Sequence, residues 1–527
     1  MKVHFFTLLL MFTAYSASAQ VTYASDIAEI IYTNCSTCHR SGEIGPMALT
    51  NYEEVKSWGA MIEYVTENRI MPPWQPNPDY SSFLGENYLT DEEIQKISDW
   101  VENGMLQGNP AEEPPFPDFP DGSTLGEPDL VLEMAEEWLH EGNFEDDYRY
   151  FVLPTNLPED KIIKAVEFRP GNPKIVHHAL VFEDLSGDAA ANDAATPEYG
   201  FDGFGSFSNS GPASILEQKQ FPGYVPGQKP IRYPDGVGQV LHAGADIVLQ
   251  LHYAPWPVDE SDKSKINIFF MDEDEEVLER QLYSEIMVPI EPYVSQTFII
   301  PANTVKEFHG TYTVPVDVSL VNIAPHMHLL GKHWEIWMEK PGGEIVNLIN
   351  IPEWDFNWQG SYYFDRYMVA PAGTVIHAVA SYDNTSTNPN NPSNPPQFVS
   401  WGEGTTDEMF YLPIGFVFYQ PGDEDIVFGN PSSTSDLRLN DGSTVYPVKP
   451  NPVSDHSLIG FHLTKGQPLN ISIFDTNGKL VRVLREGEFF NMGEHHVDMS
   501  TRQLNAGVYF IQIEGTDLLM TQKFVKH

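Results

Sequence analysis

The sequence predicts a multidomain protein that is mainly β: a small all-α domain, two all-β domains and a C-terminal β-sandwich. Three observations support this fold class. Apolar residues at helical spacing occur over residues 24–105, short alternating runs divided by Pro, Gly, Asn and Asp fill residues 128–429, and further strand-like runs follow a Ser/Thr-rich stretch. A chain of 527 residues also exceeds what one hydrophobic core supports.

The composition is that of folded, acidic domains. Hydrophobic residues make up 41% of the chain and aromatic residues 12%, which excludes disorder over most of its length. The formal net charge is −46, from 29 Lys and Arg against 75 Asp and Glu. Because so acidic a surface repels nucleic acid, we expect no nucleic-acid partner.

Residues 1–19 are typical of a secretory signal peptide. A basic residue is followed by an apolar run from Phe5 to Phe12 and a small-residue end, so cleavage is expected before Gln20. The apolar run is too short to span a bilayer, and no later stretch is long and apolar enough. The sequence therefore predicts an exported protein with no transmembrane segment.

Residues 20–107 form the predicted all-α domain. A first helix is expected to begin at a Ser25 cap, and a later helix is marked by a capping box of Thr90 and Glu93. Residues 108–127 are rich in Pro and acidic residues, which predicts a linker.

The strongest chemical motif is CSTCH, which contains the only two cysteines, Cys35 and Cys38, followed directly by His39. Two thiols at this spacing can bond covalently to the vinyl groups of a haem, and the adjacent histidine then binds the iron. A CxxC disulfide or redox pair is the alternative. Since the domain is exported, helical and has His directly after the second Cys, we expect one covalently attached c-type haem.

The other side of the haem iron requires a thioether or a second histidine. Met71 is the predicted ligand, because the two prolines after it favour an extended loop. Met47 and Met61 are the alternatives; Met47 would have to loop back, and Met61 is expected in the helical core. Residues 24–105 resemble cytochrome c at CSTCH and loosely elsewhere, which implies a cytochrome c domain.

The next block of the chain is expected to form antiparallel sandwiches, as in the alternating segments DIVLQLHYAPW, GTVIHAVASYDN and KHWEIWMEK. It is long for a single sandwich, so a break near residue 280 divides it into two predicted domains, 128–280 and 281–430.

Histidines recur in these predicted strands. His326 and His328 are two residues apart, so a strand aims both imidazoles at one point, as a metal site requires; ordinary core or surface histidines are the alternative. His177 and His178 are adjacent in an apolar run, and a regular strand would point them to opposite faces. His252 lies in a further predicted strand.

Four motifs, HHALVF, LQLHYAPW, HMHLLGK and TTDEMF, occur in this order within residues 128–425. Together they resemble the copper type II, ascorbate-dependent monooxygenases, the family of peptidylglycine alpha-hydroxylating and dopamine beta-monooxygenases. The resemblance implies two jelly-roll domains that face each other across a cleft and hold one copper ion each. By position it implies an electron-transfer copper at His177, His178 and His252, and an oxygen-activating copper at His326, His328 and Met409.

The ligand types suit copper. Imidazole binds both copper oxidation states and a thioether favours Cu(I), whereas methionine is an unusual zinc ligand. Ala324 departs from the family pattern, because peptide-processing members have an arginine there that grips the substrate carboxylate. The bracing cysteines of the animal enzymes are also absent, so peptidylglycine is not the expected substrate.

Other residues near these motifs have weaker assignments. Asp407 and Glu408 either orient the metal-binding side chains without binding the metal themselves, or form a solvated turn. The remaining histidines of interest are interpreted as structural or surface residues: His140, His242, His309, His333 and His377.

Residues 446–527 follow a predicted linker at 431–445 and resemble the C-terminal sorting domain of the type IX secretion system, through YPVKPNPVSD, IFDTNGKLV and LNAGVYFIQI. A plain accessory β-sandwich is the alternative. Asn477-Gly478 lies between two alternating runs and predicts a hairpin. The resemblance implies a Gram-negative cell whose type IX machinery exports the protein from the periplasm to the cell surface or beyond.

The function that these motifs predict is a secreted copper-dependent monooxygenase, which hydroxylates a C–H bond of a small organic substrate with dioxygen. Its electrons would come from ascorbate, or from an external redox protein through the fused haem. The alternative is a non-catalytic copper-binding and electron-carrier protein at the cell surface.

Overall fold

The computed structural model confirms a mainly β protein with few helices. The described residues are 20–119, 122–203, 206–209, 218–272, 278–402, 404–428, 444–445, 448, 453, 456–475, 480–502, 504, 507–515 and 518–526. The predicted signal peptide, residues 431–443 of the predicted linker and the Asn477-Gly478 turn lie outside them. The chain divides into two compact units, Met1–Gly429 and Asn430–His527.

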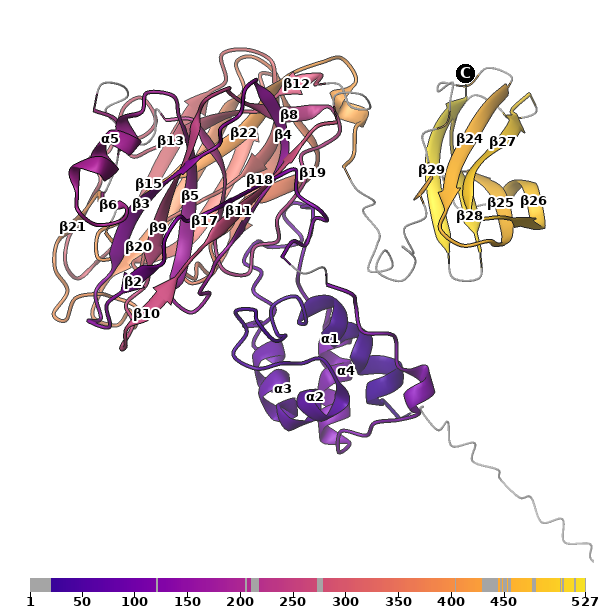
Figure 1. Ribbon diagram of the computed structural model, residues 1–527, viewed down its shortest axis with the longest axis horizontal. Coiled ribbons are helices and arrows are strands. Elements are labelled where there is room, and N and C mark those ends of the chain that lie inside the picture. Colours follow the sequence, from indigo (N-terminus) through magenta and orange to yellow (C-terminus); the bar gives the residue numbers. More distant parts are fainter. Residues whose placement is uncertain are drawn as a thin grey trace, which may run out of the picture. The chain divides into compact units, whose positions relative to one another are not determined.

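Short helices form the N-terminal region of the first unit (Figure 1). They are η1 (Tyr23–Ile27), α1 (Ala28–Asn34), α2 (Tyr52–Ser57), α3 (Gly59–Glu67) and α4 (Asp91–Glu102). Their apolar faces share one core, which includes the fully buried Tyr23, Ile31, Val55 and Trp100.

Of the two helix caps predicted from the sequence, one is present in the structure and the other is not. The predicted capping box of Thr90 and Glu93 is present at α4. The predicted Ser25 cap is wrong, because the first helix starts earlier, after Thr22, and Ser25 lies inside its first turn. There the Ser25 hydroxyl contacts the Thr22 hydroxyl at 2.8 Å.

The first part of the predicted linker, up to Phe119, lies against the helical region. After η2 (Pro110–Glu112), Glu113 accepts a 2.7 Å hydrogen bond from the Tyr32 hydroxyl, and Phe116 packs edge-on against the Tyr32 ring. The Arg40 guanidinium lies 3.9 Å from the centre of the Phe119 ring. These contacts fix the beginning of the linker in place.

The strands that follow form two five-stranded sheets with a shared core that includes Phe151, Ile163 and Leu249. The first sheet, in the order β1-β11-β4-β8-β12, comprises β1 (Leu130–Glu133), β4 (Lys161–Arg169), β8 (Val237–Leu241), β11 (Lys265–Phe270) and β12 (Arg280–Gln281). The second, in the order β6-β3-β9-β5-β7, comprises β3 (Asp147–Pro154), β5 (Val176–Asp184), β6 (Phe201–Asp202), β7 (Gln220–Tyr224) and β9 (Asp246–Tyr253). Beside them lie α5 (Asp188–Ala195) and the pair β2 (Trp138–His140) and β10 (Glu260–Asp262).

Two four-stranded antiparallel sheets follow, around a second core that includes Phe308, Trp334 and Phe410. One sheet, in the order β13-β22-β16-β19, comprises β13 (Tyr283–Met287), β16 (Val318–Ile323), β19 (Tyr362–Ala370) and β22 (Leu412–Phe418). The other, in the order β15-β20-β17-β18, comprises β15 (Thr304–Thr313), β17 (Gly331–Glu339), β18 (Ile345–Ile351) and β20 (Val375–Asn384). The pair β14 (Ile299–Ile300) and β21 (Val399–Ser400) and the turn η4 (Asp423–Asp425) complete this region.

A segment between α3 and α4 joins the helical region to the sheets. Phe83 is buried in the second β core, forms an isolated bridge with Phe364 and stacks on its ring. Trp74 packs against the same core, and Leu84 N donates a 2.7 Å hydrogen bond to Tyr363 O. The helical region is therefore attached to the sheets at a second place besides the linker.

The second unit is a pair of sheets around its own core, which includes Phe461, Ile471 and Ile511. Its strands are β23 (Thr444–Val445), β24 (His456–Leu463), β25 (Gln467–Asp475), β26 (Leu480–Phe490), β27 (Gly493–Ser500), β28 (Gly507–Glu514) and β29 (Leu519–Lys526). β25 and β26 pair antiparallel, as the predicted hairpin requires.

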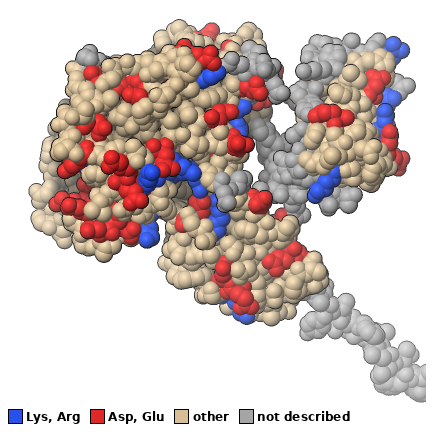
Figure 2. Space-filling model, viewed as in Figure 1, with Lys and Arg blue, Asp and Glu red and all other residues tan. Residues whose placement is uncertain are grey.

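Acidic side chains are spread widely over the first unit on the face in Figure 2, and basic side chains form smaller groups. This distribution agrees with the net charge of −46. Among the described residues, no helix is long and apolar enough to cross a membrane.

Candidate metal centre

His177, His178 and His252 come together between β5 and β9. The Nδ1 atom of His178 lies 3.4 Å from His177 Nδ1 and 3.3 Å from His252 Nδ1, and ligand atoms of all three lie within 4.8 Å of one another. Two ligands that are each about 2.0 Å from one ion are separated by about 3.3 Å at a tetrahedral angle. The three imidazoles are thus placed so that they could share one metal ion.

A β-bulge allows the adjacent residues His177 and His178 to face the same neighbouring strand residue. The pairing of β5 with β9 shifts register between Val176 and His178, which leaves His177 as the extra residue. Because a bulge turns its side chains away from strict alternation, both neighbours can face His252. The alternation of a regular strand, which would point His177 and His178 to opposite faces, therefore does not apply here.

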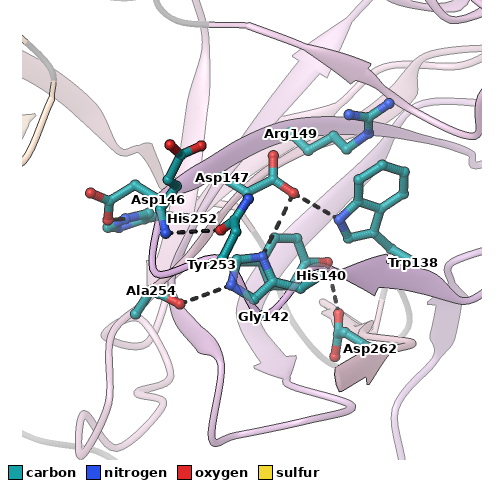
Figure 3. Close-up of polar contacts among 12 residues, drawn as sticks. Trp138, His140, Gly142, Asp146, Asp147, Arg149, His252, Tyr253, Ala254 and Asp262 are labelled. Carbon is teal, nitrogen blue, oxygen red and sulfur yellow. Dashed lines mark hydrogen bonds and ion pairs between the residues drawn. The ribbon is translucent and has the colours of Figure 1, made fainter. Parts of the chain in front are cut away.

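The His252 ring is held from both sides. Its Nε2 donates a 2.6 Å hydrogen bond to Asp146 Oδ1 (Figure 3), and Tyr148 stacks on the ring at 4.1 Å with an interplanar angle of 6°. In the neutral ring, a proton on Nε2 leaves the lone pair of Nδ1 available for a metal. Figure 3 also shows Trp138 Nε1 donating to Asp147, which anchors the residue next to Asp146.

We expect Asp146→Ala to weaken the predicted binding of copper at this cluster about 10- to 100-fold, since the lost carboxylate orients His252. Competition with a chelator of known affinity measures the change. Glu145→Ala removes the neighbouring surface carboxylate and should leave affinity unchanged. Equal affinities for both variants would contradict this role for Asp146.

His326 and His328 lie just beyond the end of β16, in an extended segment where His326 bridges to Tyr411. Met327 between them is fully buried in the second β core, so the two histidines share the opposite side of the chain. Their ring centroids are 5.0 Å apart with an interplanar angle of 83°. The alternation that the HxH spacing predicts is therefore present, although the segment is not a regular strand.

Both of these rings donate a hydrogen bond through Nδ1. His326 Nδ1 lies 2.5 Å from the Gln359 side-chain oxygen, and His328 Nδ1 lies 3.1 Å from the Asp407 carbonyl oxygen. A carbonyl oxygen can only accept, so the neutral rings present the lone pair of Nε2. His326 and His328 therefore offer Nε2 to a metal, whereas His252 offers Nδ1.

Glu408 holds the HxH segment and Met409 together. Its buried carboxylate accepts hydrogen bonds from the backbone N–H groups of His328, Leu330 and Met409, at 2.9, 2.7 and 3.0 Å. Burial raises the pKa of Glu408 to about 8. A solvated turn is therefore excluded for Glu408, whereas Asp407 is exposed and acts through its backbone oxygen.

Met409 lines the same cavity as His178, His326 and His328. The structure thus brings members of both predicted metal sites to one cavity, the histidine cavity. Phe356 lies between the two sites: its ring stacks on His177 at 5.2 Å and packs edge-on against His328 at 5.7 Å. Phe356, Gln359, Asp146 and Tyr148 were not predicted, and no spacing or motif distinguishes them in the sequence.

Burial keeps these imidazoles neutral. It lowers the pKa of His177 to about 4, that of His326 to about 3 and that of His328 to about 4. In an unfolded chain the same rings have a pKa near 6.5, so the unfolded state binds more protons between pH 6.5 and 4. Neutral imidazole is also the form that binds a metal.

We therefore expect the copper-free protein to lose stability as the pH falls from about 6.5 towards 4. Urea unfolding at several pH values measures the free energy. His326→Ala and His328→Ala together should reduce the pH dependence. A free energy of unfolding that stays constant over this range would contradict the burial argument.

Cys35, Cys38 and His39 lie at the end of α1. Both cysteines are free thiols, and burial raises the pKa of Cys35 to about 12. His39 Nδ1 donates to Met47 O at 3.2 Å, which leaves Nε2 available for a metal. A Cβ on Gly45 would lie 2.7 Å from His39 Nδ1, so only glycine allows this close approach. The segment thus presents free thiols and a ligand nitrogen, as haem attachment requires.

The two alternatives to Met71 differ in their surroundings. Met47 packs against the helical core. Met61 is 49% exposed, so its predicted place in that core is wrong; α3 instead turns Ile62 and Thr66 inward. Met71 follows α3 and is partly buried, and its role as a haem ligand stays a prediction.

The other histidines have partners outside the histidine cavity. His140 is buried and its Nε2 contacts Ala254 O at 3.0 Å, and His242 contacts Glu183 at 3.0 Å. On the outer face of the β15–β20 pair, His309 Nε2 lies 3.1 Å from His377 Nδ1. His333 contacts the Asn350 amide at 3.0 Å.

A family model described as a secretion system C-terminal sorting domain matches residues 444–527. The chain therefore carries the predicted type IX sorting domain, and the protein is secreted to the cell surface or outside the cell. The match begins two residues before the predicted start at 446, where Thr444–Val445 pairs with β24.

No curated protein matches the chain. A β-glucuronidase of Faecalibacterium prausnitzii is 12% identical, with 43% of this chain and 38% of that chain covered and a TM-score of 0.13. The VP2 subviral particle of infectious bursal disease virus is 9% identical, with 58% of this chain and 76% of that chain covered and a TM-score of 0.16. The chain spans well under half the length of the β-glucuronidase, and likenesses this slight inform neither fold nor function.

Proposed function

We propose that this secreted protein is a copper-dependent monooxygenase that hydroxylates a C–H bond of a small organic substrate. The observation that carries the proposal is the arrangement around the histidine cavity. Three imidazoles converge at β5 and β9, and one of them, His178, lines the cavity together with His326, His328 and Met409. The two sites offer the donor sets, three imidazoles and two imidazoles with a thioether, that copper accepts in both oxidation states.

Copper ions held by these six side chains would supply one-electron redox chemistry and the activation of dioxygen. The protein's own contribution is to fix the ligands before any ion binds. Asp146 and Tyr148 orient His252, while Gln359 and the Asp407 carbonyl oxygen orient His326 and His328. Ligands held in this way keep their geometry when the metal changes its charge.

Hydroxylation by this route consumes one dioxygen, two electrons and two protons for each alcohol and water formed. Ascorbate or an external redox protein would supply the electrons. A c-type haem attached at Cys35 and Cys38 would supply a one-electron relay.

Contacts between the helical region and the β-sheets support this relay role. Glu43, close to the CSTCH segment, forms a 3.0 Å ion pair with Arg169 of β4. Lys229 lies close enough to Cys38 for their charges to interact, and burial lowers the Lys229 pKa. These contacts hold the CSTCH segment, where a haem would be attached, close to the β-sheets.

The experiment is oxygen consumption by the full chain after copper loading, with ascorbate and a panel of amides, amines and polysaccharide fragments. Labelled dioxygen should place one labelled oxygen atom in the product, as mass spectrometry would detect, and two copper ions per chain should be bound. Copper binding without any labelled product would favour the electron-carrier alternative. A chain that binds no copper would contradict both functions.

A further inference from the structure

The histidine cavity has a volume of about 260 Å³. His178 contributes from the three-histidine cluster, and His326, His328 and Met409 contribute from the second site. Any molecule that fills the cavity therefore contacts both predicted metal sites. An engineered cavity of about 150 Å³ holds a benzene molecule, so this cavity has room for a single ring with a short side chain.

The cavity wall is mainly apolar, with polar groups set into it, and it carries no charged side chain among the described residues. Aspartate, glutamate, lysine and arginine are all missing from its lining, in a chain whose charged residues make up 20%. Apart from the imidazoles and two serines, the polar groups are phenol hydroxyls, as in Tyr224, Tyr233 and Tyr411, and amides, as in Gln250, Gln359 and Asn322.

Several of these amides already have partners within the protein. Gln359 bonds to His326, Gln250 donates to the Tyr150 hydroxyl at 2.8 Å, and Asn322 donates to Ser361 at 2.9 Å. These hydrogen bonds fix the amide side chains in place and leave few of their donors and acceptors to solvate a bound ion. A bound ion would thus lose its hydration without gaining a counter-charge from the wall.

The cost of such a transfer decides the ligand class. Moving a charged group into a site that provides no opposite charge costs several kcal/mol, whereas a hydroxyl or amide loses less and can bond to a tyrosine. A carboxylate would find positive charge only at bound metal ions, where it would compete with dioxygen. Ala324 also lines the cavity, and its methyl group offers no positive charge to a bound carboxylate.

We propose that the histidine cavity binds an uncharged molecule made of one ring and a short hydroxyl- or amide-bearing side chain. Tyrosine faces pack against the ring, and phenol hydroxyls bond to the side chain. The inference that this molecule is also hydroxylated rests on the proposed function. The inference that it binds in the cavity does not.

The test uses three probes that share a ring and differ in charge: 2-phenylethanol, 2-phenylethylamine and phenylacetate. Each is titrated calorimetrically into the full chain after copper has been removed with a chelator. We expect the alcohol to bind at least tenfold more tightly than the amine or the acid. An ion that binds as tightly as the alcohol, or the binding of none of the three, overturns the proposal.

Two variants of Ala324 give a matched comparison. Ala324→Arg puts a guanidinium into the wall, and Ala324→Leu fills similar space without charge. The arginine variant should gain at least tenfold in affinity for phenylacetate relative to the leucine variant. Equal affinities would mean that wall charge does not set the ligand class.

Because these measurements use copper-free protein, their result does not depend on whether oxygen is consumed. Selective binding of the alcohol together with an absence of labelled product would refute the monooxygenase and leave the ligand class intact. A labelled product formed from a charged substrate would support the monooxygenase and refute the ligand class.

Discussion

His326→Ala is expected to lower substrate-dependent oxygen consumption by about 10³-fold or more, because losses of this size follow when a group on which a reaction depends is removed. The change removes one of the three side chains of the second predicted copper site and its hydrogen bond to Gln359. The three-histidine cluster keeps all its side chains, so one of the two proposed copper ions should remain bound. An oxygen electrode and metal analysis measure the two effects.

His309→Ala is the matched control, because it removes an exposed imidazole from the outer face of β15. Its activity and copper content should equal those of the unchanged protein. If His326→Ala kept its substrate-dependent rate, the second site could not be where dioxygen reacts. A loss of both copper ions would show that the two sites bind metal cooperatively.

Above pH 8, where the Glu408 carboxyl group is ionised, Glu408→Gln is expected to destabilise the fold by about 2 to 3 kcal/mol. The carboxylate accepts hydrogen bonds from three backbone N–H groups, and an amide turns its own N–H donors towards some of them. The same three bonds fix His328 and Met409, so copper affinity at the second site should also fall, by about 10- to 100-fold. Urea unfolding and a chelator competition measure the two changes.

Asp407→Asn makes the equivalent substitution at the neighbouring residue. The Asp407 side chain is exposed and the contact to His328 comes from its backbone oxygen, so stability should change by less than about 0.5 kcal/mol. Similar losses for the two variants would mean that the turn as a whole, and not the buried carboxylate, supports the site.

Local rules predicted the parts of the fold that depend on neighbours in the sequence. The capping box at Thr90 was readable because both partners lie within one helical turn. The helix-then-strand order and the sorting domain were readable from periodicity and from motifs. Met61 was placed wrongly because an apolar residue on a short helix does not reveal which face packs against the core.

The candidate site required information that the sequence does not carry locally. HxH spacing indicated that His326 and His328 share a side, but the shared direction of His177 and His178 depends on a bulge that only the pairing with β9 creates. Phe356 and Gln359 are ordinary loop residues in the sequence. They reach the histidines because loops from separate strands meet there, and a single sequence contains no record of such contacts.

The double attachment of the helical region has a consequence for proteolysis. Trp74 and Phe83, which lie between CSTCH and the linker along the chain, pack into the second β core. A protease that cleaves between residues 113 and 119 would therefore cut the polypeptide without releasing a fragment. The nicked protein should elute from a sizing column at its original volume, and only denaturant should separate the pieces.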